Sequence, residues 1–295
     1  MDIVAEELRS DRVVLVCSAV SGCTDALIKI GSLPEGEERE TQVEALRLRH
    51  QAIVTRLFTG EERRAVSAEV DVLFGELQNA APQDCVTFGE LFSTVIIARK
   101  FACDSVSTCW LDSRRLIRTC CGEVDLDRSY AAIRGAVDEC PDVRLFVAPG
   151  FIASDEDGHV TTLGRGGSDY SAALYAAALD AGALEIWTDV PGIMTANPRV
   201  VPSAATIPEI SYGAALELAE NGAKVLYAPT VRPAMSAGIA INIKDTFDPG
   251  NPGTVVCDIR SGRPESWMGV TSLDRPQDGI SRICLVGEGV VSRRS

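Results

Sequence analysis

Residues 161–199 constrain this chain more than any other segment, because they combine a glycine-rich turn, a helix start and a strand that ends in a polar loop. The three glycines within residues 164–167 lack the side chains that would keep the backbone away from a partner. Ser168 and Asp169 then begin an alanine-rich helix, whose first amide groups have no partner within the helix. Such a helix start favours an anion, for example a phosphate or a carboxylate. The alternative interpretation is a glycine-rich hairpin followed by an ordinary capped helix.

The neighbours of this turn carry charge. Arg165, within the turn, offers a planar cation that suits a carboxylate. Asp169 is acidic where a pure anion site would avoid acid, so we expect it to orient a cation or a lysine. Further on, LEIWTDV predicts a buried strand that ends at Thr188 and Asp189, and the turn-rich PGIMTANPR follows. Because ligands in open α/β sheets bind beyond the carboxyl ends of strands, this segment favours a ligand site.

Composition excludes several classes of function. The chain has 295 residues, a formal net charge of −14 and a mean hydropathy of +0.09. This acidity argues against a nucleic-acid partner, which needs a basic face. None of the four lysines follows a glycine, which excludes a P-loop, and the absence of GxGxxG disfavours a Rossmann dinucleotide site. The length suits one large domain, or one domain with a fragment.

The sequence predicts a cytoplasmic protein without a membrane partner, because no apolar run is long enough to span a bilayer and the N-terminus is acidic. The ten cysteines include one adjacent pair, Cys120 and Cys121, but no spacing typical of a zinc site or a disulfide framework. We therefore expect reduced, mostly buried thiols. Neither histidine is expected to do chemistry: His50 lies in a polar helical region and is expected to be solvated, and His159 follows a turn.

Elsewhere the chain alternates apolar runs with amphipathic ones. The helix that begins after Ser211 is expected to close at Gly222. Strands that alternate with helices of ten or more residues imply a mostly parallel sheet with helices on both faces. The predicted strands are 12–20, 184–190, 225–227, 238–247 and 253–259, and residues 142–154 are predicted as a strand that runs into a Pro-Gly loop. The predicted helical segments are 21–33, 36–80, 87–102 and 211–222, together with the alanine-rich helix that begins at Ser168.

A family resemblance extends across roughly residues 12–257. The strings SAVSGCTDAL, GELFS, WLDSR, GFIAS, TTLGRGGSDYSAA, WTDVPGIMTANPR, GAKVLYAPT and FDPGNPGT, in this order, resemble the aspartate kinases of the amino-acid kinase superfamily. The resemblance implies an α/β fold, a three-layer αβα sandwich with a mainly parallel central sheet, here with its first strand missing. It also implies transfer of the γ-phosphoryl group of ATP to the β-carboxylate of L-aspartate. The product, 4-phospho-L-aspartate, leads toward lysine, threonine and methionine.

The resemblance also implies roles for particular residues. Asp169 and Lys224 would be catalytic, with Asp169 orienting phosphate-binding lysines; a lysine near a helix C-terminus, such as Lys224, could also simply neutralise the helix dipole. Arg165 would hold the α-carboxylate of the acceptor and Glu90 would accept from its ammonium group; by itself, a first-turn glutamate complements the helix dipole. The substrate-binding residues would be Ser18, Thr24, Glu90, Phe151, Arg165, Gly166, Gly167 and Ser168, and the ATP-binding residues Thr188, Asp189, Met194, Arg199, Lys224 and Val225.

The carboxylate acceptor and the nucleotide set the remaining chemistry. A carboxylate is already ionised at neutral pH, so its phosphorylation needs positioning and charge neutralisation rather than a general base. Mg²⁺ would bridge the phosphates and be held largely by the nucleotide and water, with no protein ligand to the metal. The expected partners are L-aspartate and ATP, and a homodimer is common in the family.

The sequence departs from the family pattern in three places. The KFGGTS motif, whose lysine bridges the ATP phosphates, has no counterpart here, so we expect weak or no activity from the chain as given. Met194 and Asn197 replace a tyrosine and an aspartate, and Tyr227 stands where histidine is common, which alters the expected adenine contacts. Residues 1–262 are interpreted as the kinase domain and residues 263–295 as a truncated remnant of an ACT regulatory region, a loose or borrowed tail with one strand.

Three functional interpretations stay open at this point. The first is an active aspartate kinase. The second is a catalytically impaired or inactive protein of the same fold, a paralogue or fragment that acts as a binding or regulatory subunit. The third is another amino-acid kinase, with a different acceptor.

Overall fold

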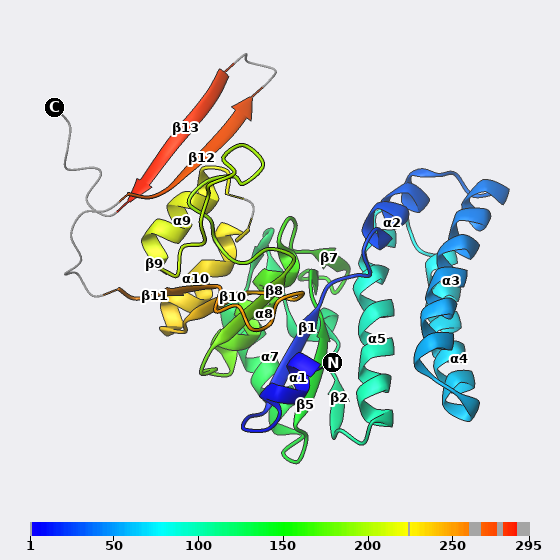
Figure 1. The fold of residues 1–295 in the computed structure, drawn as a ribbon. Coiled ribbons are helices and arrows are strands. Elements are labelled where there is room, and N and C mark those ends of the chain that lie inside the picture. Colours follow the sequence, from blue (N-terminus) through cyan, green and yellow to red (C-terminus); the bar gives the residue numbers. More distant parts are fainter. Residues whose placement is uncertain (1, 224, 260–266, 276–279, 288–295) are drawn as a thin grey trace. The chain divides into compact units, whose positions relative to one another are not determined.

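The structure is a computed structural model that describes residues 2–223, 225–259, 267–275 and 280–287 (Figure 1). The chain divides into two compact units, residues 1–171 and 172–295, and the division falls within helix α8, Gly167–Ala178. None of the helices in the described ranges is long and apolar enough to cross a membrane.

The first unit contains a small parallel sheet with the strand order β1-β5-β2. Two short hairpins, β3–β4 and β6–β7, lie outside this sheet. The elements are α1 Asp2–Glu7, β1 Val13–Cys17, α2 Cys23–Ser32, α3 Glu37–Leu57, α4 Gly60–Gln78, a 3₁₀ turn η1 Cys85–Thr87, α5 Phe88–Cys103, β2 Thr108–Trp110, α6 Ser113–Leu116, β3 Thr119–Cys120, β4 Glu123–Val124, α7 Leu126–Asp138, β5 Leu145–Pro149, β6 Ile152–Ser154 and β7 Val160–Thr162.

The central strand β5 explains why this sheet forms. All five of its residues are buried, as expected for a parallel strand covered on both faces. Leu145 and Val147 pack against Ala98 and Phe101 of α5, so an apolar side of that helix covers one face. The register pairs Cys17 with Pro149, and therefore β1 and β5 end at the same edge of the sheet.

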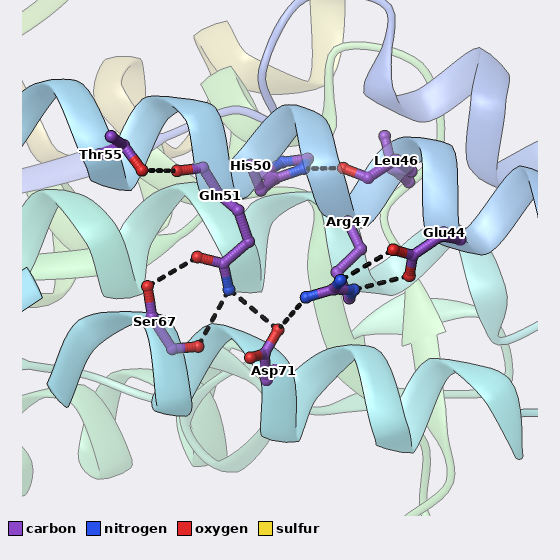
Figure 2. A network of polar contacts seen from close by, with 8 residues as sticks. All are labelled: Glu44, Leu46, Arg47, His50, Gln51, Thr55, Ser67 and Asp71. Carbon is purple, nitrogen blue, oxygen red and sulfur yellow. Dashed lines mark hydrogen bonds and ion pairs between the residues drawn. The ribbon is translucent and has the colours of Figure 1, made fainter. Parts of the chain in front are cut away.

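The predicted helical segment 36–80 is confirmed as two long helices, α3 and α4, which lie side by side (Figure 1). A polar network joins them on one side (Figure 2): Gln51 accepts from the hydroxyl of Ser67 at 2.7 Å, and its amide group donates to Asp71 at 2.9 Å. Arg47 forms an ion pair with the same Asp71 at 2.9 Å.

The expectation that His50 is solvated is wrong. Its side chain is fully buried, and its ring lies 5.0 Å from that of Phe92 and 5.6 Å from that of Phe74. Nδ1 donates to the carbonyl of Leu46 at 2.9 Å, while Nε2 has no partner among the described residues. His50 belongs to the narrow inward side of a largely polar helix, and it shares that side with Leu46 and Val54.

The second unit contains a four-stranded sheet of order β8-β10-β11-β9. Its neighbours run parallel except β10 and β11, so the expected mostly parallel α/β arrangement is confirmed. The elements after α8 are β8 Leu184–Thr188, β9 Glu209–Ser211, α9 Tyr212–Glu220, α10 Ala228–Ala237, β10 Ile241–Asp245, β11 Thr254–Cys257, β12 Trp267–Arg275 and β13 Ile280–Gly287.

Two local predictions about this unit can be compared with the structure. The cap of α9 is confirmed, because the hydroxyl of Ser211 accepts from the amide of Ala214 at 3.2 Å. The strand predicted at residues 225–227 is wrong. Tyr227 instead caps the N-terminus of α10, whose first turn contains a proline, and proline suits a helix start.

The C-terminal segment differs from the expected loose tail. Strands β12 and β13 pair as an antiparallel hairpin, and the hairpin contacts α9 (Figure 1). Val286 is buried in the same apolar cluster as Leu218 of α9, and the amide of Val270 donates to the carbonyl of Thr195 at 2.8 Å. A second strand, which the sequence analysis missed, therefore gives the hairpin an apolar side to bury. Residues 263–266, 276–279 and 288–295 of the predicted remnant lie outside the described residues, and the boundary at residue 262 stays a prediction.

Candidate active site

A cavity of about 350 Å³ lies in the first unit, where β1 and β5 end. Every residue predicted to bind the acceptor amino acid lines this cavity, as does Asp169. Ala19 also lines it and was missed by sequence reasoning; its only signal is its place directly after Ser18 at a strand exit. The lining residues are Ser18, Ala19, Thr24, Glu90, Phe151, Gly164, Arg165, Gly166, Gly167, Ser168 and Asp169.

The register of the parallel sheet places this cavity. The amide of Gly150 donates to the carbonyl of Cys17 at 3.0 Å, so the chain leaves β1 and β5 at the same level. Helix α5 is fixed to this edge by the hydroxyl of Ser93, which donates to the carbonyl of Ser18 at 2.9 Å. The first turn of α5 therefore lies next to the exit of β1, which is why Glu90 reaches the cavity.

Phe151 has a backbone conformation that is rare for a side chain of its size. Its φ is 67°, and the amide of Ile152 donates to the carbonyl of Gly150 at 2.7 Å, the hydrogen-bond pattern of a tight γ-turn. Hydrogen bonds fix Phe151 on both sides of this turn. The amide of Phe151 donates to the hydroxyl of Ser171 at 2.9 Å, and the carbonyl of Phe151 accepts from the amide of Leu163 at 2.7 Å. Such strain, on the order of 1–3 kcal/mol, is concentrated at functional sites.

The glycines of this region have two different physical roles. Gly164 and Gly166 have φ values of 73° and 65°, which favour glycine in the turn itself. Gly167 is required by close packing, because a Cβ atom there would lie 2.8 Å from the ring of Phe151. Gly150 allows the same closeness from the opposite side, since its Cβ would lie 2.7 Å from the Cα of Ser168. The backbone at the start of α8 thus comes close to the segment that follows β5, as the glycine-rich sequence indicated.

The N-terminus of α8 opens into the cavity. Gly167 and Tyr170 donate to the carbonyls of Gly164 and Gly166, both at 3.0 Å. The intervening amides of Ser168 and Asp169 donate to no group in the described part of the chain. Two free amides at a helix start, in a cavity that Arg165 also lines, are the anion-binding features that the sequence indicated.

Two carboxyl groups in the cavity are desolvated. Glu90 is 4% exposed; its Oε1 accepts from the amide of Ala19 at 3.3 Å, and its Oε2 is buried without a hydrogen-bond partner. Burial raises the pKa of the Glu90 carboxyl to about 7 and that of Asp169 to about 6. A buried acceptor without a donor is costly, so a cationic ligand group at Oε2 would be favoured.

The predicted nucleotide-binding residues belong to the second unit, apart from Lys224, which lies outside the described residues. Thr188 ends β8 opposite Asp245 of β10, and its hydroxyl donates to the side chain of Asp189 at 3.3 Å. Met194 bridges to Thr206 in the loop that follows. The amide of Arg199 donates to the side chain of Asn197 at 3.0 Å, and Val225 lies between α9 and α10. Thr188 and Asp189 thus lie at a carboxyl strand end, as predicted.

The sequence pattern of the amino acid kinase family matches residues 1–245. The chain, with its parallel α/β sheets and its cavity beyond the strand ends, therefore belongs to the amino acid kinase family. Within this family it is similar to aspartokinases. It is 37% identical over 275 residues to lysine-sensitive aspartokinase 3 of Escherichia coli K12, a match that covers 89% of this chain and 61% of that relative. It is 35% identical over 257 residues to an aspartokinase of Chlamydia pneumoniae, covering 82% of this chain and 56% of the relative.

Solved structures agree with these relatives. The structure of E. coli aspartokinase III in complex with aspartate and ADP matches with a TM-score of 0.79 and 35% identity, covering 92% of this chain and 63% of that chain. The same enzyme in complex with lysine and aspartate matches with a TM-score of 0.80 and 32% identity. The chain thus has the aspartokinase-like fold and spans between 56% and 64% of the length of these proteins.

Proposed function

We propose that this chain is an ATP-dependent aspartate kinase that transfers the γ-phosphoryl group of ATP to the β-carboxylate of L-aspartate. The observation that carries the proposal is the buried Oε2 of Glu90, which has no hydrogen-bond partner in the described part of the chain, in a residue that lines one cavity together with Arg165. An amino acid presents one ammonium and one carboxylate group at its α-carbon, and these two side chains are their natural partners. The similarity to an aspartokinase solved with aspartate and ADP supports the choice of acceptor.

In this proposal the cavity positions the acceptor. Glu90 accepts from the α-ammonium group, Arg165 holds the α-carboxylate, and Ser18, Thr24 and Phe151 shape the space around the side chain. The free amides of Ser168 and Asp169 then stabilise negative charge at the start of α8. Since the β-carboxylate of L-aspartate is ionised at neutral pH, no side chain has to remove a proton from it.

The nucleotide side of the proposal rests on the second unit. ATP would contact Thr188, Asp189, Met194, Arg199 and Val225, together with Lys224, and Mg²⁺ would neutralise charge on its phosphates. Asp169 would orient a phosphate-binding lysine. Its desolvation fits such a role, because a neighbouring cation would keep the carboxylate ionised.

The proposal places the chain at the first step toward lysine, threonine and methionine, in the cytoplasm, and as a homodimer. Residues 1–262 would form the catalytic domain, and the β12–β13 hairpin would belong to a remnant of a regulatory region.

An acceptor panel tests the proposal. ADP release from Mg-ATP is measured with the purified chain and L-aspartate, L-glutamate, N-acetyl-L-glutamate or UMP as acceptor. We expect L-aspartate alone to stimulate ADP release, at a low rate because this sequence has no KFGGTS motif, and 4-phospho-L-aspartate to be trapped as its hydroxamate. Stimulation by another acceptor, or by none, contradicts the proposal.

Paired variants connect the assay to the site. Asp169→Asn is expected to reduce turnover by at least about tenfold, in line with the loss of one charge-positioning group. Asp127→Asn, an exposed first-turn carboxylate on α7, serves as the matched control and is expected to leave turnover unchanged. Equal losses in both variants would remove Asp169 from the catalytic residues.

A further inference from the structure

A second cluster of side chains that can ligate a metal lies outside the cavity, at the β3–β4 hairpin and the turn after β6. Cys120 pairs with Glu123, so the loop of this hairpin consists of Cys121 and Gly122 alone. Both loop residues have positive φ, 53° and 85°, as in the type I′ turns that usually contain Asn-Gly. Cys121 therefore adopts a conformation that its side chain disfavours, and it is exposed.

The β6–β7 hairpin brings a carboxylate to these thiols. Ser154, at the end of β6, bridges to Arg118, and its amide donates to the carbonyl of Ile117 at 3.0 Å. The turn after β6 is fixed by Asp155, whose carboxylate accepts from the amides of Asp157 at 3.0 Å and His159 at 2.8 Å. Glu156 lies within this fixed turn, next to the thiol pair.

Three ligand atoms converge as a result. The thiol of Cys120 donates to Oε1 of Glu156 at 3.1 Å, and its Sγ lies 3.9 Å from that of Cys121. The two sulfur atoms and the carboxylate oxygen lie within 4.8 Å of one another. Neither thiol nor the carboxylate forms an ion pair with a basic group in the described part of the chain. The hydrogen bond to Glu156 and the neighbouring Cys121 raise the pKa of the Cys120 thiol to about 11, as expected where acidic groups gather without a cation.

We propose that Cys120, Cys121 and Glu156 form a binding site for a soft divalent cation such as Zn²⁺ or Cd²⁺. Two zinc–sulfur bonds of about 2.3 Å at a tetrahedral angle place the sulfur atoms about 3.8 Å apart, close to the distance observed. On binding, each thiol loses its proton to solvent as its metal–sulfur bond forms, the carboxylate supplies the third ligand, and water completes the tetrahedron. Thiolate ligands favour soft cations over hard ones such as Mg²⁺ and Ca²⁺.

The sequence pattern contained no sign of this site. A Cys-Cys pair has no zinc-finger spacing, and Glu156 is far from it along the chain. Contacts of Ser154 with Ile117 and Arg118 bring the third ligand into place. The site does not depend on the proposed function, because none of its residues lines the acceptor cavity.

Metal titration of the reduced 295-residue chain tests the proposal. Cd²⁺ is followed through its thiolate charge-transfer absorbance, and Zn²⁺ by calorimetry in two buffers that differ in ionisation enthalpy. We expect one ion per chain at this site and the release of two protons for each ion bound. The double substitution Cys120→Ser and Cys121→Ser is expected to abolish the charge-transfer signal of this ion. Glu156→Gln is expected to weaken binding on the order of tenfold.

The matched control uses the thiols of Cys109 and Cys140, whose sulfur atoms also lie 3.9 Å apart. The double substitution Cys109→Ser and Cys140→Ser removes the same number of thiols, and it is expected to leave the ion at Cys120 and Cys121 in place. Two results would overturn the proposal. One is that the double variant of Cys120 and Cys121 binds as many metal ions per chain as the wild type. The other is that the control variant loses the same number of bound ions. Circular dichroism of each variant checks that the chain is folded.

Discussion

The amide of Ala19 donates a hydrogen bond of 3.3 Å to Oε1 of Glu90 and thereby fixes the orientation of a buried carboxylate. Ala19 follows the exit of β1, and Glu90 lies in the first turn of α5. Only Oε1 accepts this hydrogen bond, and Oε2 is buried without a hydrogen-bond partner in the described part of the chain. In the proposed function, Glu90 is therefore a recognition group for the ammonium group of the acceptor and does more than complement a helix dipole.

Replacing Glu90 by glutamine is expected to stabilise the ligand-free protein at alkaline pH. The folded pKa of Glu90 is raised, from 4.5 to about 7. The favourable contribution of the Glu90 carboxyl to the free energy of unfolding is therefore fully present below pH 4.5, and it is lost as the pH rises through about 7. Ionising this buried group costs on the order of 3 kcal/mol, at about 1.4 kcal/mol for each pKa unit. Urea unfolding at pH 8 should show Glu90→Gln to be more stable than the wild type, with little gain at pH 5.

The exposed Glu139→Gln provides the control for this comparison and should change stability by less than about 0.5 kcal/mol at either pH. The carboxyl group of Glu90 also couples the binding of L-aspartate to the release of protons. If Glu90 accepts from an ammonium group, binding of L-aspartate near pH 7 releases protons in the wild type but not in the variant. Identical proton release from both proteins would separate Glu90 from the ligand.

Gly150→Ala is expected to destabilise the first unit by about 1–3 kcal/mol, the usual effect of forced overpacking. The new Cβ would lie 2.7 Å from the Cα of Ser168, so the start of α8 would have to move. Gly135→Ala, at an exposed position in α7 where a Cβ meets nothing within 4 Å, should instead stabilise the protein by about 0.5–1 kcal/mol. Chemical denaturation measures both; a neutral Gly150→Ala would show that the two loops are not in close contact.

His50→Leu is expected to reduce the sensitivity of the protein to acid. Burial lowers the pKa of His50 in the folded state. The unfolded chain then binds the proton more readily as the pH falls below about 6.5, and the folded state loses stability. The variant should lose less free energy of unfolding between pH 7 and pH 5 than the wild type. The exposed His159→Gln, measured in parallel, should follow the wild type.

Local patterns predicted most of the elements that build the site. The apolar run at β1, the first-turn position of Glu90 and the helix start after Gly167 were all visible as short-range signals, and the structure confirms them. Residues from three distant segments line one cavity because strand exits at the carboxyl edge of a parallel sheet meet there. The family resemblance named these residues before their proximity could be seen.

Features that depend on long-range contacts were missed. Few residues of α3 face inward, and the sequence of this helix is largely polar, so no apolar pattern predicted the burial of His50. The β12–β13 hairpin becomes stable through its contact with α9, which no local pattern reveals. Likewise, the contact between Glu156 and Cys120 depends on a long-range bridge between Arg118 and Ser154.

The central claim is that the cavity between Glu90 and Arg165 holds the acceptor amino acid, and a kinetic comparison tests it most directly. Steady-state ADP release is measured for the wild type, for Arg165→Ala and for the control Arg115→Ala, whose side chain is 84% exposed. We expect Arg165→Ala to raise the KM for L-aspartate by about tenfold or more, the effect of losing a charge-assisted hydrogen bond, with the KM for ATP nearly unchanged. The control should match the wild type. Equal increases in both KM values for Arg165→Ala would contradict the account.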